Sequence, residues 1–226
     1  MKSLALLRKV MVPAMLLFLM VAGGVSTQAQ VPTAQPAMTA SSPLSYGVRL
    51  GMGAGNFTGD AVQDDDSRIG FDAGLYLSYR VRPYLALQPE LNFAYRKIEA
   101  RHRGLPVALD QADYTFGMLD VPVLLRLYPF AVGRTQPSLF AGPMVSYQIY
   151  RDVEPVEDML PPFDEDNQYK RGMFGLTFGL GLERPVLGRP LQFDTRYVLG
   201  LTDLFRSENY PEMRLEGWTF SLGIGL

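Results

Sequence analysis

The single histidine, His102, is the residue that most directly suggests catalysis, and it lies in the segment EARHRG (residues 99–104). Hydrolases use a histidine within hydrogen-bonding distance of a serine or a carboxylate. No serine is near His102 in the sequence, although Asp110 and Asp113 follow it. We therefore interpret His102 as a solvated loop residue and predict no catalytic residues and no enzyme activity. The basic residues that flank it have an alternative role, contact with the phosphates of a glycolipid.

Clustered carboxylates are the second chemical signal. Asp64, Asp65 and Asp66 are consecutive, and a second acidic cluster falls between positions 151 and 169. Such oxygens can bind Ca²⁺, which takes about six to eight oxygen ligands. The spacing matches no calcium-binding loop, however, and prolines interrupt the second cluster, so we predict acidic surface loops with no metal ion and no cofactor. The second cluster consists of Asp152, Glu154, Glu157, Asp158, Asp164, Glu165 and Asp166.

The N-terminal segment has the parts of a secretory signal peptide: a basic start, an apolar run over 10–25 and small residues up to Ala29. We predict cleavage after Ala29, so that residues 1–29 are a signal peptide and the protein is exported from the cytoplasm. A retained N-terminal anchor is the alternative. The basic residues are Lys2, Arg8 and Lys9.

Two further parts follow the signal peptide. Residues 30–43 are rich in Pro, Ala, Ser and Thr and are expected to form a flexible periplasmic N-terminal segment. Residues 44–226 contain no linker-like stretch and are expected to form one domain. Removing the three basic residues of the signal from the chain's 21 leaves 18 basic against 23 acidic residues, which argues against nucleic acid as a partner. The chain has no cysteine, which excludes disulfides and thiolate metal sites.

Residues 44–226 alternate between apolar and polar positions with a period of two, which indicates β-strands. Over 69–79, for example, the odd positions are Ile, Phe, Ala, Leu, Leu and Tyr. The phase changes near Gly117, where we expect a β-bulge. The pattern predicts eight strands in the stretches 46–55, 69–80, 85–96, 114–127, 139–149, 173–183, 191–199 and 217–226.

The connections between these strands alternate in length. An even number of strands of about ten residues, with short turns at one end and long loops at the other, is typical of outer-membrane barrels. The predicted fold is therefore all-β: a closed antiparallel eight-stranded transmembrane β-barrel with short periplasmic turns and long extracellular loops. The short connections are 81–84, 129–137 and 185–190, and the long ones are 57–68, 97–112, 151–169 and 201–214.

The two faces of the strands predict which side meets the membrane. One face is continuous Leu, Val, Phe and Tyr and would be a very large exposed apolar patch on a soluble protein, so we expect it to face lipid. The other face carries glycines and charges that suit the narrow interior of an eight-stranded barrel. We expect its carboxylates and arginines to form ion pairs there, which argues against a diffusion pore. The predicted interior polar network consists of Arg49, Asp72, Glu90, Asp120, Arg126, Glu183, Asp194 and Arg196.

Several segments resemble the PorT-like outer-membrane β-barrel family. They are LQPELNFAYR (87–96), LDVPVLLRLYP (119–129), LFAGPMVSY (139–147), DTRYVLGLTDL (194–204) and the closing WTFSLGIGL. The resemblance covers residues 46–226. It implies a barrel in the bacterial outer membrane and a link to a protein-secretion machinery.

These observations predict an integral outer-membrane protein with a structural or interaction role, in the manner of a PorT-like component or accessory of a secretion machinery. The alternative is a surface-exposed binding or adhesion barrel that acts through its long loops. A barrel hydrolase is disfavoured. The expected partners are outer-membrane lipid and glycolipid, the outer-membrane assembly machinery, and envelope or secretion-complex proteins.

Overall fold

The computed structural model describes residues 43–58, 62–67, 69–102, 111–155, 171–202 and 214–226. Pro43–Leu226 forms one compact unit. The described residues contain no helix that is long and apolar enough to cross a membrane. Their nine strands are β1 (Leu44–Thr58), β2 (Val62–Ser67), β3 (Ile69–Arg82), β4 (Leu85–His102), β5 (Gln111–Leu127), β6 (Gln136–Pro155), β7 (Gly172–Val186), β8 (Arg189–Gly200) and β9 (Arg214–Gly225).

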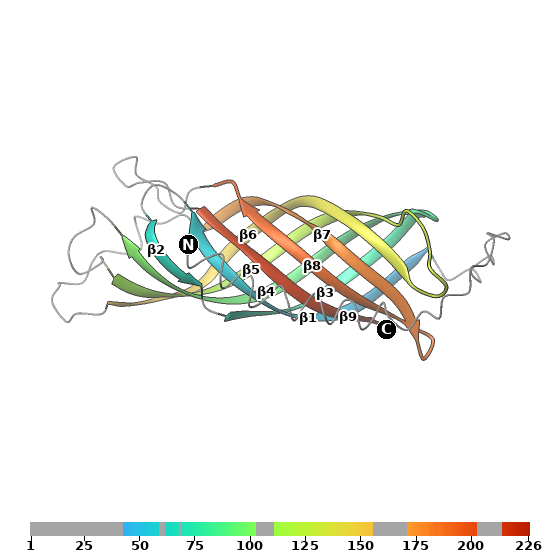
Figure 1. Ribbon diagram of the computed structural model, residues 1–226, viewed down its shortest axis with the longest axis horizontal. Helices are drawn as coiled ribbons and strands as arrows, with labels where there is room; N and C mark the ends of the chain where they lie inside the picture. The colour runs from blue at the N-terminus through green and yellow to red at the C-terminus, as the bar shows by residue number, and fades with distance from the viewer. Residues whose placement is uncertain (1–42, 59–61, 68, 103–110, 156–170, 203–213) are drawn as a thin grey trace. The chain divides into compact units, whose positions relative to one another are not determined.

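Eight of these strands close into a ring, and β2 lies outside it (Figure 1). Around the ring the order is β1, β3, β4, β5, β6, β7, β8 and β9, and the last strand pairs with the first, Gly47 opposite Gly225. Every pairing is antiparallel. Because the ring has no open edge, its backbone groups satisfy one another. The predicted closed eight-stranded barrel is confirmed.

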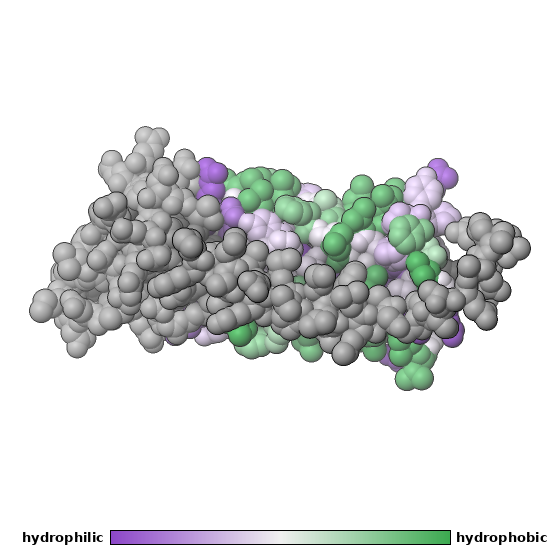
Figure 2. All heavy atoms as spheres, viewed as in Figure 1, coloured by the Kyte–Doolittle hydropathy of each residue, from purple (hydrophilic) through white to green (hydrophobic). Residues whose placement is uncertain are grey.

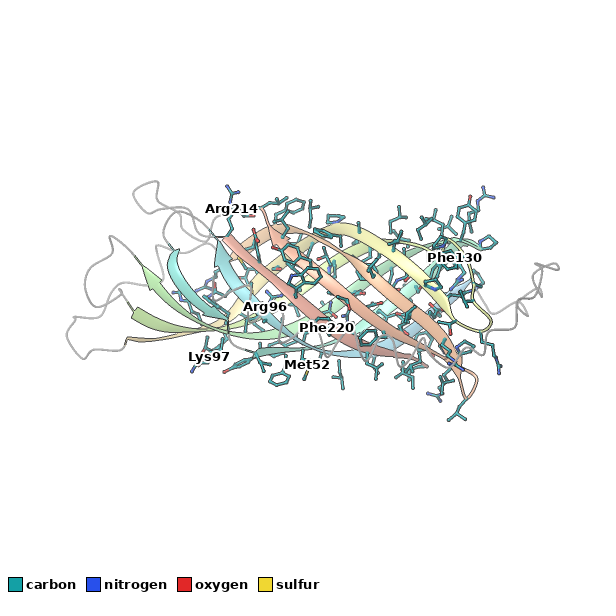
Figure 3. The ribbon with its side chains drawn as sticks, in the orientation of Figure 1. Met52, Arg96, Lys97, Phe130, Arg214 and Phe220 are labelled. Atoms are coloured by element: carbon teal, nitrogen blue, oxygen red, sulfur yellow. The ribbon has the colours of Figure 1, made fainter. Side chains whose placement is uncertain are left out.

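Alternation along each strand separates an outer from an inner face. Leu75 and Leu91 lie opposite each other on β3 and β4 and are 57% and 46% exposed. Inward residues such as Arg126, which is 0% exposed, are fully buried. On the face seen in Figure 2, hydrophobic residues gather over the middle of the barrel and hydrophilic ones toward its ends. Figure 3 likewise shows Met52 on the outside of the ring and Arg96 within it.

The strands β4, β5 and β6 continue beyond the rest of the ring, and β2 pairs along the extension of β4 (Figure 1). The pairing of β4 with β5 runs to Arg101 opposite Gln111, and that of β5 with β6 runs to Ala112 opposite Pro155. We call this four-stranded extension the projecting sheet. It consists of β2, residues 96–102 of β4, residues 111–116 of β5 and residues 151–155 of β6. It lies at the end of the long connections.

The projecting sheet corrects the predicted bounds of three long loops. Residues 62–67, predicted as loop, form β2, and the strands β4 and β6 extend to His102 and Pro155. His102 therefore lies by its backbone in a strand, opposite Val62, and not in a loop. The cause is backbone pairing: each added strand satisfies the hydrogen bonds of its neighbour, which outweighs the low β-propensity of acidic residues.

The expected β-bulge lies on a different strand. The register between β5 and β6 shifts between Gly117 and Met118, and the extra residue, Ile149, belongs to β6. On β5 the inward phase simply continues, because Phe116 and Met118 are both buried, 4% and 1% exposed. The apolar side chain of Phe116 therefore lies inside the barrel. Its place among the inward positions made the sequence pattern look like a change of phase.

A tight turn joins β7 to β8 at the end of the short connections. Val186 pairs with Arg189, and the two residues between them have positive φ, 51° at Leu187 and 79° at Gly188. Two consecutive left-handed residues form the type I′ turn that suits antiparallel hairpins. Leucine is unfavourable in this conformation, and Leu187 is 99% exposed.

Candidate functional site

The barrel interior is built around a buried arginine, Arg126 on β5. Its guanidinium donates two hydrogen bonds to Asp194 on β8, from Nη1 to Oδ1 at 2.9 Å and from Nη2 to Oδ2 at 2.7 Å. Nη1 also lies 3.1 Å from the Ser138 hydroxyl oxygen. The same group lies over the Phe140 ring, 4.6 Å from its centroid. This paired, forked geometry is the strongest form of arginine–carboxylate contact.

A second carboxylate, Glu90 on β4, receives hydrogen bonds from four side chains. Arg49 donates at 2.5 Å and Arg196 at 2.8 and 3.3 Å. Gln88 and Asn92, two residues away on either side along β4, donate at 2.8 and 3.0 Å. Since Glu90 is 4% exposed, these donors supply the solvation that water would otherwise provide.

Arg196 connects the two carboxylates into one network. Besides Glu90 it contacts Asp194, from Nη2 to Oδ2 at 3.1 Å. Arg49 adds a hydrogen bond to Ser221 and a longer ion pair with Asp72 at 3.8 Å. We call this set the central cluster. Its three arginines face three carboxylates, and its members are Arg49, Asp72, Glu90, Arg126, Asp194 and Arg196.

A separate polar group, the turn-end cluster, lies toward the short connections. Glu183 on β7 accepts hydrogen bonds from Arg80 at 3.1 Å, from the Tyr128 hydroxyl at 2.9 Å and from Gln192 at 3.2 Å. Arg80 also stacks over the Tyr128 ring, 4.3 Å from its centroid. These three donors satisfy the charge of Glu183 near the turns.

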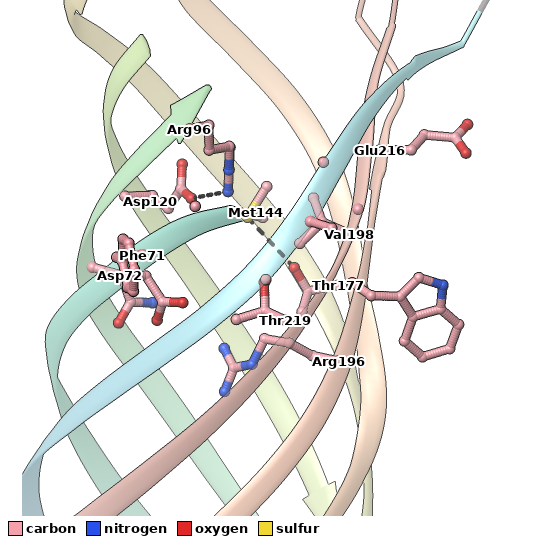
Figure 4. A pocket seen from close by; sticks show the side chains of 18 of the residues that line it. Phe71, Asp72, Arg96, Asp120, Met144, Thr177, Arg196, Val198, Glu216 and Thr219 are labelled. Atoms are coloured by element: carbon pink, nitrogen blue, oxygen red, sulfur yellow. Dashed lines mark hydrogen bonds and ion pairs between the residues drawn. The ribbon is translucent and has the colours of Figure 1, made fainter. Parts of the chain in front are cut away.

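Toward the long connections, the interior contains an ion pair and a cavity (Figure 4). Arg96 on β4 donates to Asp120 on β5 at 2.7 Å. The cavity has a volume of about 50 Å³, and its lining contains Arg96 and Asp120 together with Asp72 and Arg196 of the central cluster. Buried apolar side chains, among them Met144 and Val198, form much of its wall.

All eight residues of the predicted interior network lie on the inner side of the barrel, and the structure joins five of them directly. Arg49, Glu90, Arg126, Asp194 and Arg196 are linked by hydrogen bonds. Asp72 contacts this group only through the 3.8 Å pair with Arg49. Glu183 belongs to the turn-end cluster.

One ion pair involves an arginine outside the predicted network. Asp120, which was expected to pair inside the barrel, pairs with Arg96. Asp120 lies opposite Asn92 on β4, and Arg96 projects from the same inner face of that strand, so the long arginine side chain reaches back along the wall. Asp120 therefore forms its ion pair with Arg96 on the adjacent strand and not with an arginine deeper in the barrel.

Arg80 and Arg96 were not included in the predicted network, although both form ion pairs inside the barrel. Both are long side chains near strand ends, where the pattern alone does not separate an inward from a solvent-directed conformation. Phe140 was missed altogether, because an inward aromatic breaks the polar pattern. The neighbouring residues Pro137 and Ser138 give no sign that the Phe140 ring stacks under two arginines. The Cζ atoms of Arg126 and Arg196 lie 4.6 and 5.4 Å from the centroid of this ring.

The residues first considered for catalysis and metal binding contribute little to this interior. The side chain of His102 and most of the second acidic cluster lie outside the described residues. Asp64, Asp65 and Asp66 belong to β2. Within the part of the chain that the structure describes, no group of three or more His, Cys, Asp or Glu residues is placed to hold a metal ion.

The family of the chain follows from comparison with protein-family models. Residues 28–206 match the model described as outer membrane protein beta-barrel domain. The chain belongs to this family. It is an outer-membrane β-barrel protein of eight ring strands, and the fold described above is the one that the family name implies.

Solved structures of other outer-membrane proteins are similar to this chain at low identity. OprG from Pseudomonas aeruginosa is 15% identical, with 80% of this chain and 94% of OprG covered and a TM-score of 0.48. Neisserial surface protein A is 14% identical, with 82% and 97% covered and a TM-score of 0.48. Ail of Yersinia pestis is 12% identical, with 80% and 98% covered and a TM-score of 0.42. No curated protein matches the chain.

Proposed function

We propose that this outer-membrane barrel is an interaction protein that docks envelope partners through its projecting sheet. The observation that carries the proposal is the unequal length of the strands: β4, β5 and β6 extend past the ring and gain β2. A barrel that served only to cross the membrane has no need of strands beyond the ring. A preformed sheet outside it offers a rigid surface for a partner.

The interior of the barrel supports the same proposal, because side chains fill it and leave little space for transport. An eight-stranded barrel encloses only enough space for side chains. Here the central cluster spans that space, with Arg49 on β1, Glu90 on β4 and Arg196 on β8 in direct contact. We propose that this cluster seals the barrel as a polar plug. The outward apolar face then contacts lipid.

The finer proposal is that the partner belongs to a protein-secretion machinery, as the PorT-like resemblance implies. Export by the predicted signal peptide and insertion by the outer-membrane assembly machinery are part of this proposal. We further propose that the short turns are periplasmic and that the projecting sheet is extracellular, the usual orientation of such barrels.

The orientation can be tested with single cysteines, because the chain has none of its own. Ala112→Cys places a thiol on the projecting sheet, where Ala112 pairs with Ala100 and Pro155. Arg189→Cys places one beside the β7–β8 turn as a matched control. A membrane-impermeant maleimide should label Ala112→Cys in intact cells and Arg189→Cys only in permeabilised cells. The reverse labelling would contradict the proposed orientation.

The docking role is tested by photo-crosslinking in the native host. A photoreactive residue replaces Thr115, which lies on β5 opposite Lys97, and a second variant carries it at Arg189. We expect Thr115 to crosslink to envelope proteins and Arg189 to give a different pattern. Crosslinks from Thr115 to secretion components would support the proposal that the partner belongs to a protein-secretion machinery. Capture of an added host or matrix ligand alone supports the adhesion alternative, and crosslinks to lipid alone contradict a docking role.

A further inference from the structure

Each of the three short turns contains a single charged residue, and in every turn that residue is an arginine. The turns 81–84, 129–137 and 185–190 contain Arg82, Arg134 and Arg189, which we call the turn arginines. All three are exposed, and within the described part of the chain none of them forms an ion pair. The acidic side chain that the described structure places beside these turns, Glu183, is already paired with Arg80.

The charge of this end of the barrel is opposite to that of the long connections. Arg184, exposed on β7 just before the third turn, adds to the positive side, and the carboxylate of Leu226 at the C-terminus compensates one charge. The four long connections together contain more acidic than basic residues. The end with the short turns, opposite the projecting sheet in Figure 1, therefore attracts anions.

Exposed apolar side chains accompany the arginine in every short turn, two to a turn. Water is an unfavourable surrounding for them. The headgroup region of a bilayer, in contrast, accepts apolar and aromatic side chains together with the aliphatic stems of arginines. Figure 3 shows one of these residues, Phe130, at this end of the barrel. The six residues are Val81, Tyr84, Phe130, Val132, Val186 and Leu187.

Strand pairing places the turn arginines at the edge of the outer apolar wall. Arg82 pairs with Leu85, which in turn pairs with the exposed Leu127. Residues paired across antiparallel strands share a face, so Arg82 lies on the outer face where the apolar wall ends. Arg189 pairs with the exposed Val186 where the β7–β8 hairpin ends. At this edge of the wall, lipid headgroups meet the barrel.

The spread of the turn arginines favours lipid over a protein as their partner. The β3–β4, β5–β6 and β7–β8 turns follow one another around the ring, so each arginine lies at a different place on its circumference. One protein segment would have to extend across the whole end of the barrel to reach all three. Lipid surrounds the barrel, and it can therefore contact every turn independently.

We propose that the turn arginines bind the phosphate groups of anionic phospholipids in the adjoining leaflet. Guanidinium groups bind phosphate through paired N–H donors, and the apolar neighbours lie among the upper parts of the acyl chains. These contacts hold the barrel at a fixed depth in the membrane. The proposal concerns the end opposite the projecting sheet, so it does not depend on the docking role. If the short turns are periplasmic, the leaflet is the periplasmic one.

The test measures which lipid lies beside each end of the barrel, with single-tryptophan proteins in nanodiscs. Trp218 of the wild type pairs with Ala54 and Tyr197, toward the long connections. The double variant Trp218→Phe/Phe130→Trp moves the reporter to the second short turn. The discs contain equal amounts of phosphatidylcholine and phosphatidylglycerol, and one of the two lipids carries brominated acyl chains that quench tryptophan.

We expect the Phe130→Trp reporter to be quenched more strongly by brominated phosphatidylglycerol. The difference should correspond to about a fivefold preference, the amount that one arginine supplies at an anionic surface. Trp218 should show no such preference. Raising the salt concentration to about 1 M should remove most of the preference, because the Debye length is then only about 3 Å.

Two sets of variants assign the preference to the arginines. Replacing all three by glutamine should abolish it, whereas replacing all three by lysine, which keeps the charge, should preserve it. Insertion is checked in each case in pure phosphatidylcholine through the fluorescence of Trp218. If the triple glutamine variant does not insert, Arg134→Gln alone should still lower the preference, since Arg134 shares a turn with the reporter.

The proposal is overturned if brominated phosphatidylglycerol and brominated phosphatidylcholine quench the Phe130→Trp reporter equally, or if the glutamine variants keep the preference. A photoreactive residue at Leu187, which is 99% exposed, tests the alternative of a protein partner in the native host. We expect it to crosslink to phospholipid. A dominant crosslink to a protein that disappears in the glutamine variant would show that the turn arginines bind that protein, and would equally overturn the proposal.

Discussion

Replacing Arg126 by methionine should destabilise the barrel by about 3 kcal/mol. The change removes two hydrogen bonds to Asp194 and one contact with Ser138. Removing one member of a buried ion pair typically costs about 3–5 kcal/mol, because the other charge is left uncompensated. Asp194 keeps one contact, Arg196 at 3.1 Å, so we expect the lower end of this range.

The free energy of unfolding can be measured by urea titration in lipid vesicles. Trp218, the only tryptophan in the chain, faces outward on β9, so its fluorescence reports whether the barrel is inserted. Arg184→Met is the control, since Arg184 is an exposed arginine near the β7–β8 turn. We expect this control to change the unfolding free energy by less than about 0.5 kcal/mol.

A double variant separates the ion pair from simple loss of volume. Adding Asp194→Asn to Arg126→Met removes the uncompensated charge and should recover about 1.5 kcal/mol, within the range seen for directly interacting residues. The reasoning is refuted if Arg126→Met costs no more than Arg184→Met. It is also refuted if the double variant is as unstable as the sum of the two single variants.

Three further predictions concern the outer face, the histidine and a turn. Leu75→Arg and Leu91→Arg should each cost about 2–4 kcal/mol in bilayers if they lie near the midplane, and unchanged stability of both would mean that the faces are reversed. His102→Ala should complement a deletion strain fully, whereas loss of function at normal surface levels would favour an enzyme. Leu187→Asn should stabilise the barrel by about 1 kcal/mol, because asparagine tolerates positive φ better than leucine. A destabilised Leu187→Asn variant in urea titration would contradict the assigned turn.

The ring strands were predictable because their sequence signal is repeated along each strand. Residues such as Leu75 and Leu91 alternate with small or polar residues over a full strand, and a one-residue slip would reverse every side chain. The projecting sheet lacked this signal. Asp64, Asp65 and Asp66 of β2 have low β-propensity, and they form a strand because β4 supplies backbone partners.

The interior residues were predictable as a set but not as pairs. The polar face follows from alternation alone, and it correctly puts Arg126 and Asp194 inside. Their contact joins β5 to β8, which are not neighbours in the ring, so it depends on how far the strands are staggered. The sequence contains no local signal for that stagger. The sequence also contains no signal for the register between the adjacent strands β4 and β5, so the pairing of Asp120 with Arg96 became clear only in the structure.

The proposed polar plug is tested most directly by the conductance of the purified protein in planar lipid bilayers. Because the central cluster joins β1, β4, β5 and β8 across the interior, we expect the wild-type barrel to insert without regular conductance steps. Insertion is verified in the same samples by the fluorescence of Trp218. Long-lived steps of uniform size from the inserted wild-type protein would show that the interior is an open channel, and would contradict the account.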